Sequence, residues 1–456
     1  MARFLALALP MLALADGRTS SFWRKEQPGA LIPLSNILDD AAVQQHRVIG
    51  GSPDEVMITF ASATPVASTV KFGEVSSDGE VYFWAVAHGQ STVTSSLNYY
   101  TPVGPDGVPI WDDAHWGTYT DPADYYTSPF IHAVKLGGLK ASTTYRYFVP
   151  SSGDDVGEGQ QTVGEGEKTF EFTTTPAVGP DARIRFGLMA DVGQTDDSLQ
   201  TMQHMFDHLN RTDDDDDKID AIIFPGDLSY ADGEGVRWDS WGVLGEFLLA
   251  NVVTTYVPGN HEFGNGENFA GYMSRYPTPH ERAAEGSTKL WYSHEAGPAH
   301  VINLCSYCDV KTNSSQYAWL AADLASIDRA KTPWVLAQWH SPWYNSNNYH
   351  KNDTNSMNMK ADLEPLFKQY GVDMGFAGHV HSYERTNPVY GWQVAPAGQC
   401  GMVHVCIGDG GNREGAATDW YEPQPDWSSM REASFGHGTL DLINATTARW
   451  RWWRNQ

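Results

Sequence analysis

The chain has 456 residues, of which 41% are hydrophobic and 12% aromatic, and its 30 basic and 56 acidic side chains give a formal net charge of −26. This length is too great for one compact core and predicts two or three domains. The negative charge repels nucleic acid and anionic membranes, so we expect neither as a partner, and an anionic ligand would need a local positive source such as clustered metal cations.

The first residues predict a secretory signal peptide. Arg3 precedes a short apolar stretch, and Ala13 and Ala15 have the small-x-small spacing of a cleavage site. The stretch is too short to span a bilayer, and no later run reaches about 18 apolar residues. We therefore exclude residues 1–15 from the fold and expect a secreted or extracellular protein, with the cell wall or a vacuole-like compartment as candidate locations.

Sequons and cysteines agree with secretion. N-glycosylation is predicted at four positions, Asn210, Asn313, Asn352 and Asn444. In an oxidising compartment the four cysteines allow three pairings, among Cys305, Cys308, Cys400 and Cys406. The Cys305-Ser-Tyr-Cys308 segment has a redox or zinc spacing, but no second such pair follows, which favours a structural disulfide or buried thiols.

From about residue 47 to residue 176, short alternating segments predict an antiparallel β-sandwich. The segments are EVMITFAS, STVKFGE, HAVKLGGL, TTYRYFV and KTFEFTTT. An aromatic-rich insertion over residues 97–126 lacks this periodicity, and either a functional loop or a cover for the second domain is consistent with it. Pro and Gly cluster in residues 174–183, which we interpret as a linker.

From residue 182 to residue 456, predicted strands and helices alternate, which indicates an α/β domain of layered sheets covered by helices. The expected strands lie within residues 184–191, 221–227, 252–262, 300–307, 333–340, 372–381 and 402–411. The expected helices lie at 198–209, 236–249, 317–329 and 362–370. The acidic run 213–217 is interpreted as a solvated loop, because adjacent like charges repel.

Residues that can bind metals follow five of these strands. They are Asp191, Asp227, Asn260 with His261, His340, and His379 with His381, and Tyr230 comes three residues after Asp227. Each one alone could be a turn cap or a packed histidine. Together, in Gly- or Pro-containing turns at the carboxyl ends of strands, they predict one metal site.

The residue types indicate two metal ions. Seven ligands are too many for one tetrahedral zinc, and a carboxylate can bridge two ions. A tyrosine ligand must lose a proton whose pKa is about 10, which requires a strong Lewis acid and fits Fe(III) best. Imidazoles with an amide oxygen suit a borderline divalent ion.

The motifs GDLSY, GNHE, the histidine in WHSPWYNS, and GHVHSYER, preceded by the aspartate in ADVGQT, resemble the signature of purple acid phosphatases, which are calcineurin-like metallophosphoesterases. The resemblance covers nearly the whole chain, and GDGGNREG with REASFGHG resembles the family's C-terminal portion. It implies a fibronectin-III-like β-sandwich over residues 47–176, as in the large plant-type members, and a binuclear metallophosphoesterase domain over residues 182–456.

The resemblance also implies a role for each site residue. Fe(III) would be held by Asp191, Tyr230 and His381, with Asp227 bridging, and Zn(II) or Mn(II) by Asn260, His340 and His379, in one binuclear site per chain. His261 and His350 would face the substrate, protonated near pH 5 to 6, to stabilise the transition state and protonate the leaving group.

One position departs from the family pattern. Many close plant members have two adjacent histidines after YNS, whereas this chain has Tyr349 in the first of the two positions. A tyrosine can contact substrate and donate a hydrogen bond, but it stays neutral at acidic pH. We therefore expect an altered leaving-group preference or pH profile, with activity retained.

The expected function is that of a secreted acid phosphatase that hydrolyses small phosphate monoesters by two-metal catalysis, with a metal-bound hydroxide as nucleophile. A phytase, or a phosphodiesterase or nucleotide pyrophosphatase on the same site, is the alternative, because the pocket walls decide specificity. An alternative that is not an enzyme is a secreted binding protein, with the β-sandwich as an adhesion module and a vestigial metal site. Against this alternative, every expected metal-ligand position is filled. A homodimer is compatible with the sequence.

Overall fold

The structure is a computed structural model, and it describes residues 43–50, 52–62, 65–91, 128–150, 163, 167–212, 218–233, 235–264, 267–280, 285–396, 399 and 401–455. The predicted signal peptide, the aromatic-rich insertion over residues 97–126, the acidic run 213–217 and Cys400 lie outside the described residues.

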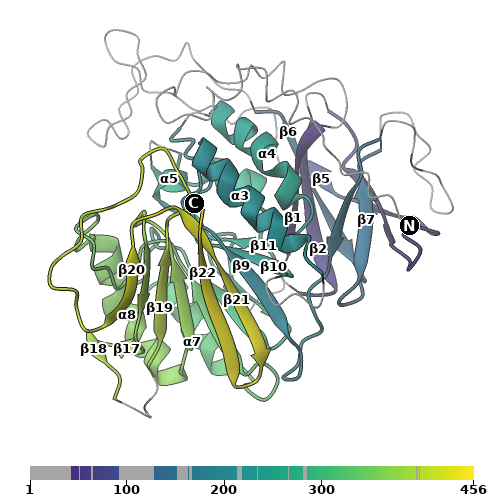
Figure 1. Ribbon diagram of the computed structural model, residues 1–456. Coiled ribbons are helices and arrows are strands. Elements are labelled where there is room, and N and C mark those ends of the chain that lie inside the picture. The colour runs from purple at the N-terminus through teal and green to yellow at the C-terminus, as the bar shows by residue number, and fades with distance from the viewer. Residues whose placement is uncertain are drawn as a thin grey trace, which may run out of the picture.

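The N-terminal part is rich in strands, and they form two groups (Figure 1). In the first group β2 (Glu55–Ser62), β6 (Phe130–Gly137) and β5 (Gln90–Ser91) pair antiparallel. The second group is a separate sheet in the order β4 (Ala85–His88), β3 (Thr69–Glu74), β7 (Thr144–Phe148), β8 (Phe170–Thr173). Apolar residues of both groups, such as Ile58 and Tyr147, belong to one buried cluster. The period-2 alternation that predicted these strands reflects this burial of one face.

Strand β1 (Val43–Gly50), which sequence reasoning missed, joins the N-terminal strands to the rest of the chain. It pairs antiparallel with β2 and parallel with β11 (Val253–Tyr256), where Val48 lies opposite Val253. A nine-stranded sheet results, in the order β22-β21-β9-β10-β11-β1-β2-β6-β5. The first N-terminal group therefore continues a sheet of the C-terminal part, and sheet hydrogen bonds cross from one part to the other.

The C-terminal part consists of two sheets packed face to face. The nine-stranded sheet contributes β9 (Ile184–Leu188), β10 (Ala221–Phe224), β11, β21 (Gly436–Asn444) and β22 (Thr447–Arg454). The second sheet has the order β12 (Tyr292–Ala296), β13 (Ala299–Asn303), β14 (Trp334–Gln338), β15 (Met374–Ala377), β19 (Val403–Ile407), β16 (Tyr383–Thr386), β20 (Ser428–Glu432). A short hairpin joins β17 (Val389–Tyr390) to β18 (Gln393–Val394).

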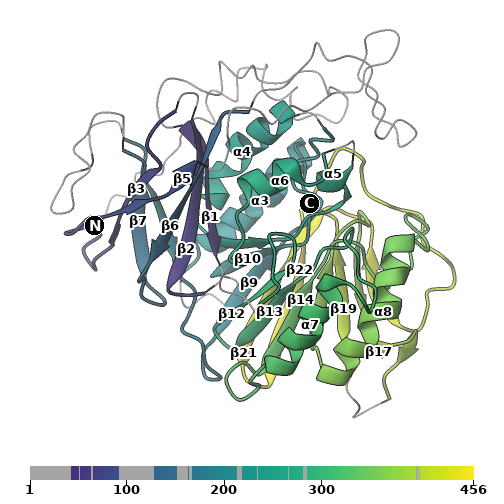
Figure 2. The same cartoon turned by 180° about the vertical axis from the view of Figure 1, so that it is seen from behind.

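Helices cover the outer faces of both sheets (Figures 1 and 2). On the nine-stranded sheet lie α3 (Asp196–Leu209) and α4 (Gly235–Leu249), and on the second sheet lie α7 (Ser315–Ser326) and α8 (Thr354–Tyr370). Strand alternation explains the layers, because Ile223 belongs to the cluster between the sheets and Ile222 to the cluster under α3 and α4. The predicted α/β layering is thus confirmed. No helix within the described ranges is long and apolar enough to cross a membrane.

Candidate metal centre

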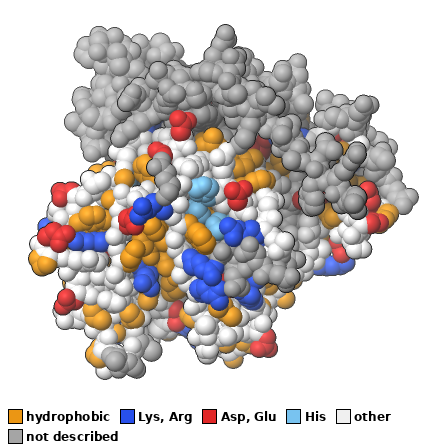
Figure 3. Space-filling model, in the orientation of Figure 1, with side chains coloured by type: hydrophobic (Ala, Val, Ile, Leu, Met, Phe, Trp, Pro, Cys, Tyr) orange, Lys and Arg blue, Asp and Glu red, His pale blue; other side chains and the backbone are white. Residues whose placement is uncertain are grey.

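The predicted site residues follow strand ends in strained turns. Asp191, Asp227, Tyr230 and His379 all have positive φ, between 51° and 69°. Residues other than glycine rarely adopt this conformation, and where they do, the surrounding structure imposes it, often at functional sites. The chain leaves each strand sharply, which directs these side chains toward one point. Histidine side chains gather at one place on the face seen in Figure 3, but His340, His379 and His381 are themselves buried.

Asp191, Tyr230 and His381 form the first half of the site. The Tyr230 hydroxyl lies 3.3 Å from Asp191 Oδ1 and 3.1 Å from His381 Nε2, and His381 Nε2 lies 3.4 Å from Asp191 Oδ1. All three side chains are buried. His381 Nδ1 lies 3.2 Å from the carbonyl of Gly415, an acceptor that fixes the proton on Nδ1 and directs the Nε2 lone pair inward.

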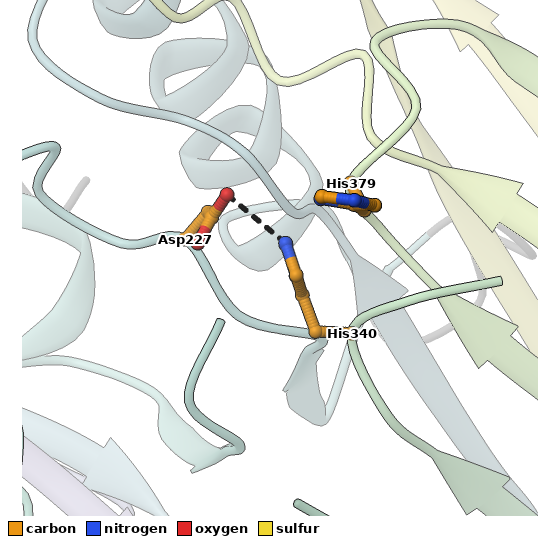
Figure 4. Close-up of side chains that lie close together, drawn as sticks. All are labelled: Asp227, His340 and His379. Atoms are coloured by element: carbon orange, nitrogen blue, oxygen red, sulfur yellow. Dashed lines mark ion pairs between the residues drawn. The ribbon is translucent and has the colours of Figure 1, made fainter. Parts of the chain in front are cut away.

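Asp227, Asn260, His340 and His379 form the second half. His340 Nε2 lies 3.0 Å from Asp227 Oδ2 and 3.1 Å from Asn260 Oδ1. Figure 4 shows Asp227 and His340 pointing toward each other, with His379 beside them. One ligand atom from each of these three side chains lies within 4.8 Å of the others. The two halves meet at His340, whose Nε2 lies 3.0 Å from Asp227 Oδ2 and 3.9 Å from Asp191 Oδ1.

The second half fits a cation. His340 Nδ1 lies 2.8 Å from the Pro225 carbonyl and donates to it, so Nε2 faces two oxygens about 3 Å away. These atoms require a positive charge between them, which a proton on Nε2 supplies without metal and a bound cation would supply in its place. Asp227 Oδ2 is buried and has no hydrogen-bond partner among the described residues. Burial lowers the pKa of His340, but Asp227 and Asp191 outweigh it and raise this pKa to about 9, so the site attracts positive charge.

Glu262, the last residue of GNHE, supports the turn that carries Asp227. It is buried, and its carboxylate accepts the backbone N–H groups of Asp227, Leu228 and Gly259 at 2.8–2.9 Å. Sequence reasoning quoted the motif but assigned no role to this glutamate. The signal that could have identified Glu262 is its position in GNHE, the short motif that also contains Asn260 and His261.

His261 faces the site from α5 (Asn260–Phe263). Its Nδ1 is hydrogen-bonded to Asp232, which also pairs with Arg413, and its Nε2 lies 3.4 Å from Glu414 Oε1 and 3.8 Å from Asp227 Oδ2. Burial lowers the pKa of His261, but Asp232, Asp227 and Glu414 outweigh it and hold this pKa well above its usual value. Sequence reasoning missed Asp232 and Glu414, because neither follows a strand.

His350 and Tyr349 lie on the other side of the site. The His350 ring stacks on His379 with centroids 3.7 Å apart, and the Tyr349 hydroxyl donates to Glu414 Oε2 at 3.0 Å. Burial, together with His379 and His381, lowers the pKa of His350 to about 2. These surroundings favour the neutral ring, and the protonated His350 expected from the sequence stays a prediction. The structure thus brings every predicted site residue together.

Comparisons with known proteins agree with this arrangement. Residues 184–383 match the calcineurin-like phosphoesterase family, and residues 401–456 match the iron/zinc purple acid phosphatase-like protein C family. The chain is 35% identical to a purple acid phosphatase of Glycine max, over 99% of this chain and 92% of that protein. It is 36% identical to a phosphoenolpyruvate phosphatase of Allium cepa, over 96% of this chain and 85% of that protein.

Among solved structures, a purple acid phosphatase from yellow lupin seeds has the same fold. It aligns with a TM-score of 0.71 at 22% identity, covering 90% of this chain and 72% of that chain. The 35% identity to the Glycine max protein extends over 99% of this chain and shows the family. The chain belongs to the purple acid phosphatases, metal-dependent phosphomonoesterases whose binuclear centre pairs iron with a second metal.

Proposed function

We propose that this chain is an acid phosphatase that hydrolyses small phosphate monoesters at a centre of Fe(III) with Zn(II) or Mn(II). The observation that carries the proposal is the convergence of lone pairs from Asp227, Asn260 and His340 on one buried point, directly beside the Asp191, Tyr230 and His381 group. When bound, the two cations supply a Lewis-acid pair that polarises the phosphate and lowers the pKa of water.

The residues divide between the two ions by type and position. Asp191, Tyr230 and His381 would hold Fe(III), because a phenolate needs a strongly charged ion. Asn260, His340 and His379 would hold the divalent ion. Asp227 would bridge, since a carboxylate can bind two ions and His340 Nε2 lies 3.0 Å from Asp227 Oδ2 and 3.9 Å from Asp191 Oδ1. Its Oδ1 is held in place by the His261 backbone N–H at 2.9 Å.

His261 is the proposed proton donor and phosphate ligand. Asp232 holds its Nδ1, so Nε2 faces the site and is directed toward an oxygen of bound substrate. His350 and Tyr349 would contact the substrate from the opposite side. Glu414, whose side chain is 34% exposed, lies between these two sides and adds negative charge at the entrance. The cation pair offsets that charge and attracts a phosphate dianion into an acidic protein.

The relatives support small phosphorylated substrates, and one of them is named a phosphoenolpyruvate phosphatase. A phytase, or a phosphodiesterase or nucleotide pyrophosphatase, remains the alternative on the same site. A panel of phosphate esters compared by kcat/KM separates these, because the metal ligands are common to all and only the pocket walls differ.

The same proposal includes a secreted, two-domain protein, with a fibronectin-III-like domain over residues 47–176 and a catalytic domain over residues 182–456. The two packed groups of N-terminal strands support the first domain. Secretion is supported by the signal-like N-terminus, by a disulfide between Cys305 and Cys308, and by four exposed sequon asparagines, Asn210, Asn313, Asn352 and Asn444. A homodimer is also part of the prediction, and the molecular mass measured in solution tests it.

Replacing the bridging carboxylate tests the central claim. Asp227→Ala should lose both metals and the turnover of p-nitrophenyl phosphate together, because both ions lose a shared ligand. Asp207→Asn is the matched control, since this aspartate is exposed on α3. A metal-free Asp227→Ala protein that still turns over at the wild-type rate would refute the scheme.

A further inference from the structure

The loop after β13 is closed by a disulfide and packed against the divalent half of the site. Cys305 and Cys308 are bonded to each other across only two intervening residues, Ser306 and Tyr307. Gln316 of α7 holds the start of the loop from a fully buried position. Its Oε1 accepts the Cys305 N–H at 2.8 Å, and its Nε2 donates to the Cys305 carbonyl at 3.1 Å. The loop therefore has a fixed position relative to the sheet.

Ser306 sets the backbone that carries His340. The buried Ser306 hydroxyl oxygen accepts the backbone N–H groups of His340 and Ser341, each at 3.0 Å. These two residues follow β14 after Trp339, where the chain turns away from the sheet. With its backbone held here and its Nδ1 bonded to the Pro225 carbonyl, the His340 ring has one orientation.

Tyr307 contacts the amide of Asn260. Its hydroxyl donates to Asn260 Oδ1 at 3.1 Å, and its ring is nearly parallel to that of Phe263, with centroids 6.1 Å apart. The same ring lies 6.1 Å from the His340 ring and 6.5 Å from the His379 ring. A carbonyl oxygen has two lone pairs, so a donor on one fixes the plane of the amide and leaves the other directed at the site.

From these contacts we propose that Ser306 and Tyr307 are positioning residues for the divalent ion, and that the Cys305–Cys308 disulfide holds both in place. The inference rests on the proposed assignment of Asn260, His340 and His379 to that ion. The loop is hydrogen-bonded to two of these three ligands, Asn260 through its side chain and His340 through its backbone, and the Tyr307 ring lies edge-on to the third, His379. Among the described residues, no hydrogen bond or ring contact joins the loop to Asp191, Tyr230 or His381, the proposed iron ligands.

The test measures the affinity of the purified protein for Zn(II) by competition with a chelator, alongside its visible absorption band. Tyr307→Phe removes the hydroxyl and keeps the ring, and Ser306→Ala removes the acceptor, both with the disulfide intact. Each should weaken Zn(II) binding by roughly 10- to 100-fold, the usual loss when a ligand's hydrogen-bond partner is removed. The band from tyrosinate on iron should stay unchanged, which a general loss of structure would not allow.

The double variant Cys305→Ser/Cys308→Ser should weaken Zn(II) binding in the same direction, also with an unchanged band. Tyr317→Phe is the matched control, because this ring packs against the core cluster under α7. Asn260→Ala distinguishes a failure of the positioning role from a failure of the metal assignment. If it weakens Zn(II) binding while Tyr307→Phe and Ser306→Ala match the wild type, the inference is overturned and the metal assignment stands. If Asn260→Ala also matches the wild type, the assignment itself is wrong.

Discussion

The Tyr230 hydroxyl lies 3.1 Å from His381 Nε2, although 151 residues separate the two in the chain. Tyr230 comes from the turn after β10, and His381 from the turn after β15. The contact joins the nine-stranded sheet to the second sheet at one buried point. Within the proposed iron site, the phenolate is the one ligand that gives Fe(III) a visible charge-transfer colour.

Replacing this tyrosine tests the iron assignment. Tyr230→Phe should abolish the broad visible band while sparing the fold, because the ring and its packing against His261, with centroids 4.0 Å apart, are kept. Visible absorption, iron content and thermal unfolding are measured on the same sample. Tyr370→Phe, on the last turn of α8, is the control and should keep its colour. A Tyr230→Phe protein with the full band would show that another residue is the source of colour.

Glu262 is predicted to hold the Asp227 turn. Glu262→Gln keeps the shape but places an amide NH2 against one of the three backbone N–H donors. Leaving a buried donor unpaired costs about 1–3 kcal/mol. We expect a lower melting temperature and weaker retention of both metals, measured by calorimetry and by metal analysis after dialysis. Glu285→Gln, at an exposed turn that precedes β12, is the control. Unchanged stability and metal content in Glu262→Gln would exclude this supporting role.

Tyr349 is predicted to tune the reaction. Its hydroxyl donates to Glu414 Oε2, and burial, with Glu414 next to it, raises its pKa above the usual value, so it stays a neutral donor throughout the acidic range. Tyr349→His should move the pH profile of kcat/KM or change the dependence on leaving-group pKa, because an imidazole can become charged where a phenol cannot. The check is to measure kcat/KM against pH for the wild type and for Tyr349→His, with p-nitrophenyl phosphate and with an alkyl phosphate. Identical profiles for both proteins would refute the prediction.

His404 is predicted to make the fold sensitive to acid. It is buried among Trp339, Trp343 and Tyr344, and both ring nitrogens lack a hydrogen-bond partner among the described residues. Burial, with Lys360 adding to it, lowers its pKa from 6.5 to about 3. The folded pKa lies below the unfolded one, so the stability gained from the neutral ring is complete above pH 6.5 and is lost as pH falls toward 3. The loss is about 1.4 kcal/mol per pH unit.

His404→Leu should therefore shrink the drop in melting temperature between pH 7 and pH 4.5, whatever its effect at pH 7. His88→Leu, at an exposed position, is the matched control and should keep the wild-type drop. Equal drops in His404→Leu and the wild type would mean that this histidine does not contribute to acid sensitivity.

The sequence by itself determined the layered α/β architecture and the set of residues that meet at the site. Period-2 and buried apolar runs identify strands locally, and residues such as Asp191, Asp227 and His340 directly follow such runs. Because parallel strands end at the same edge of a sheet, the residues after β9, β10 and β11 converge, and so do those after β14 and β15. This local information was sufficient to gather the metal-binding side chains of each sheet, and the packing of the two sheets brings both groups to one point.

Only the tertiary structure decided what surrounds those side chains. The β1 segment has no clear alternation, and its place is set by pairing with β11, about 200 residues away. Asp232, Glu414 and Tyr307 lie in loops, where no periodicity marks them, and they reach the site through contacts with His261, Tyr349 and Asn260. Such contacts depend on how distant segments pack, and no local pattern in the sequence encodes that packing.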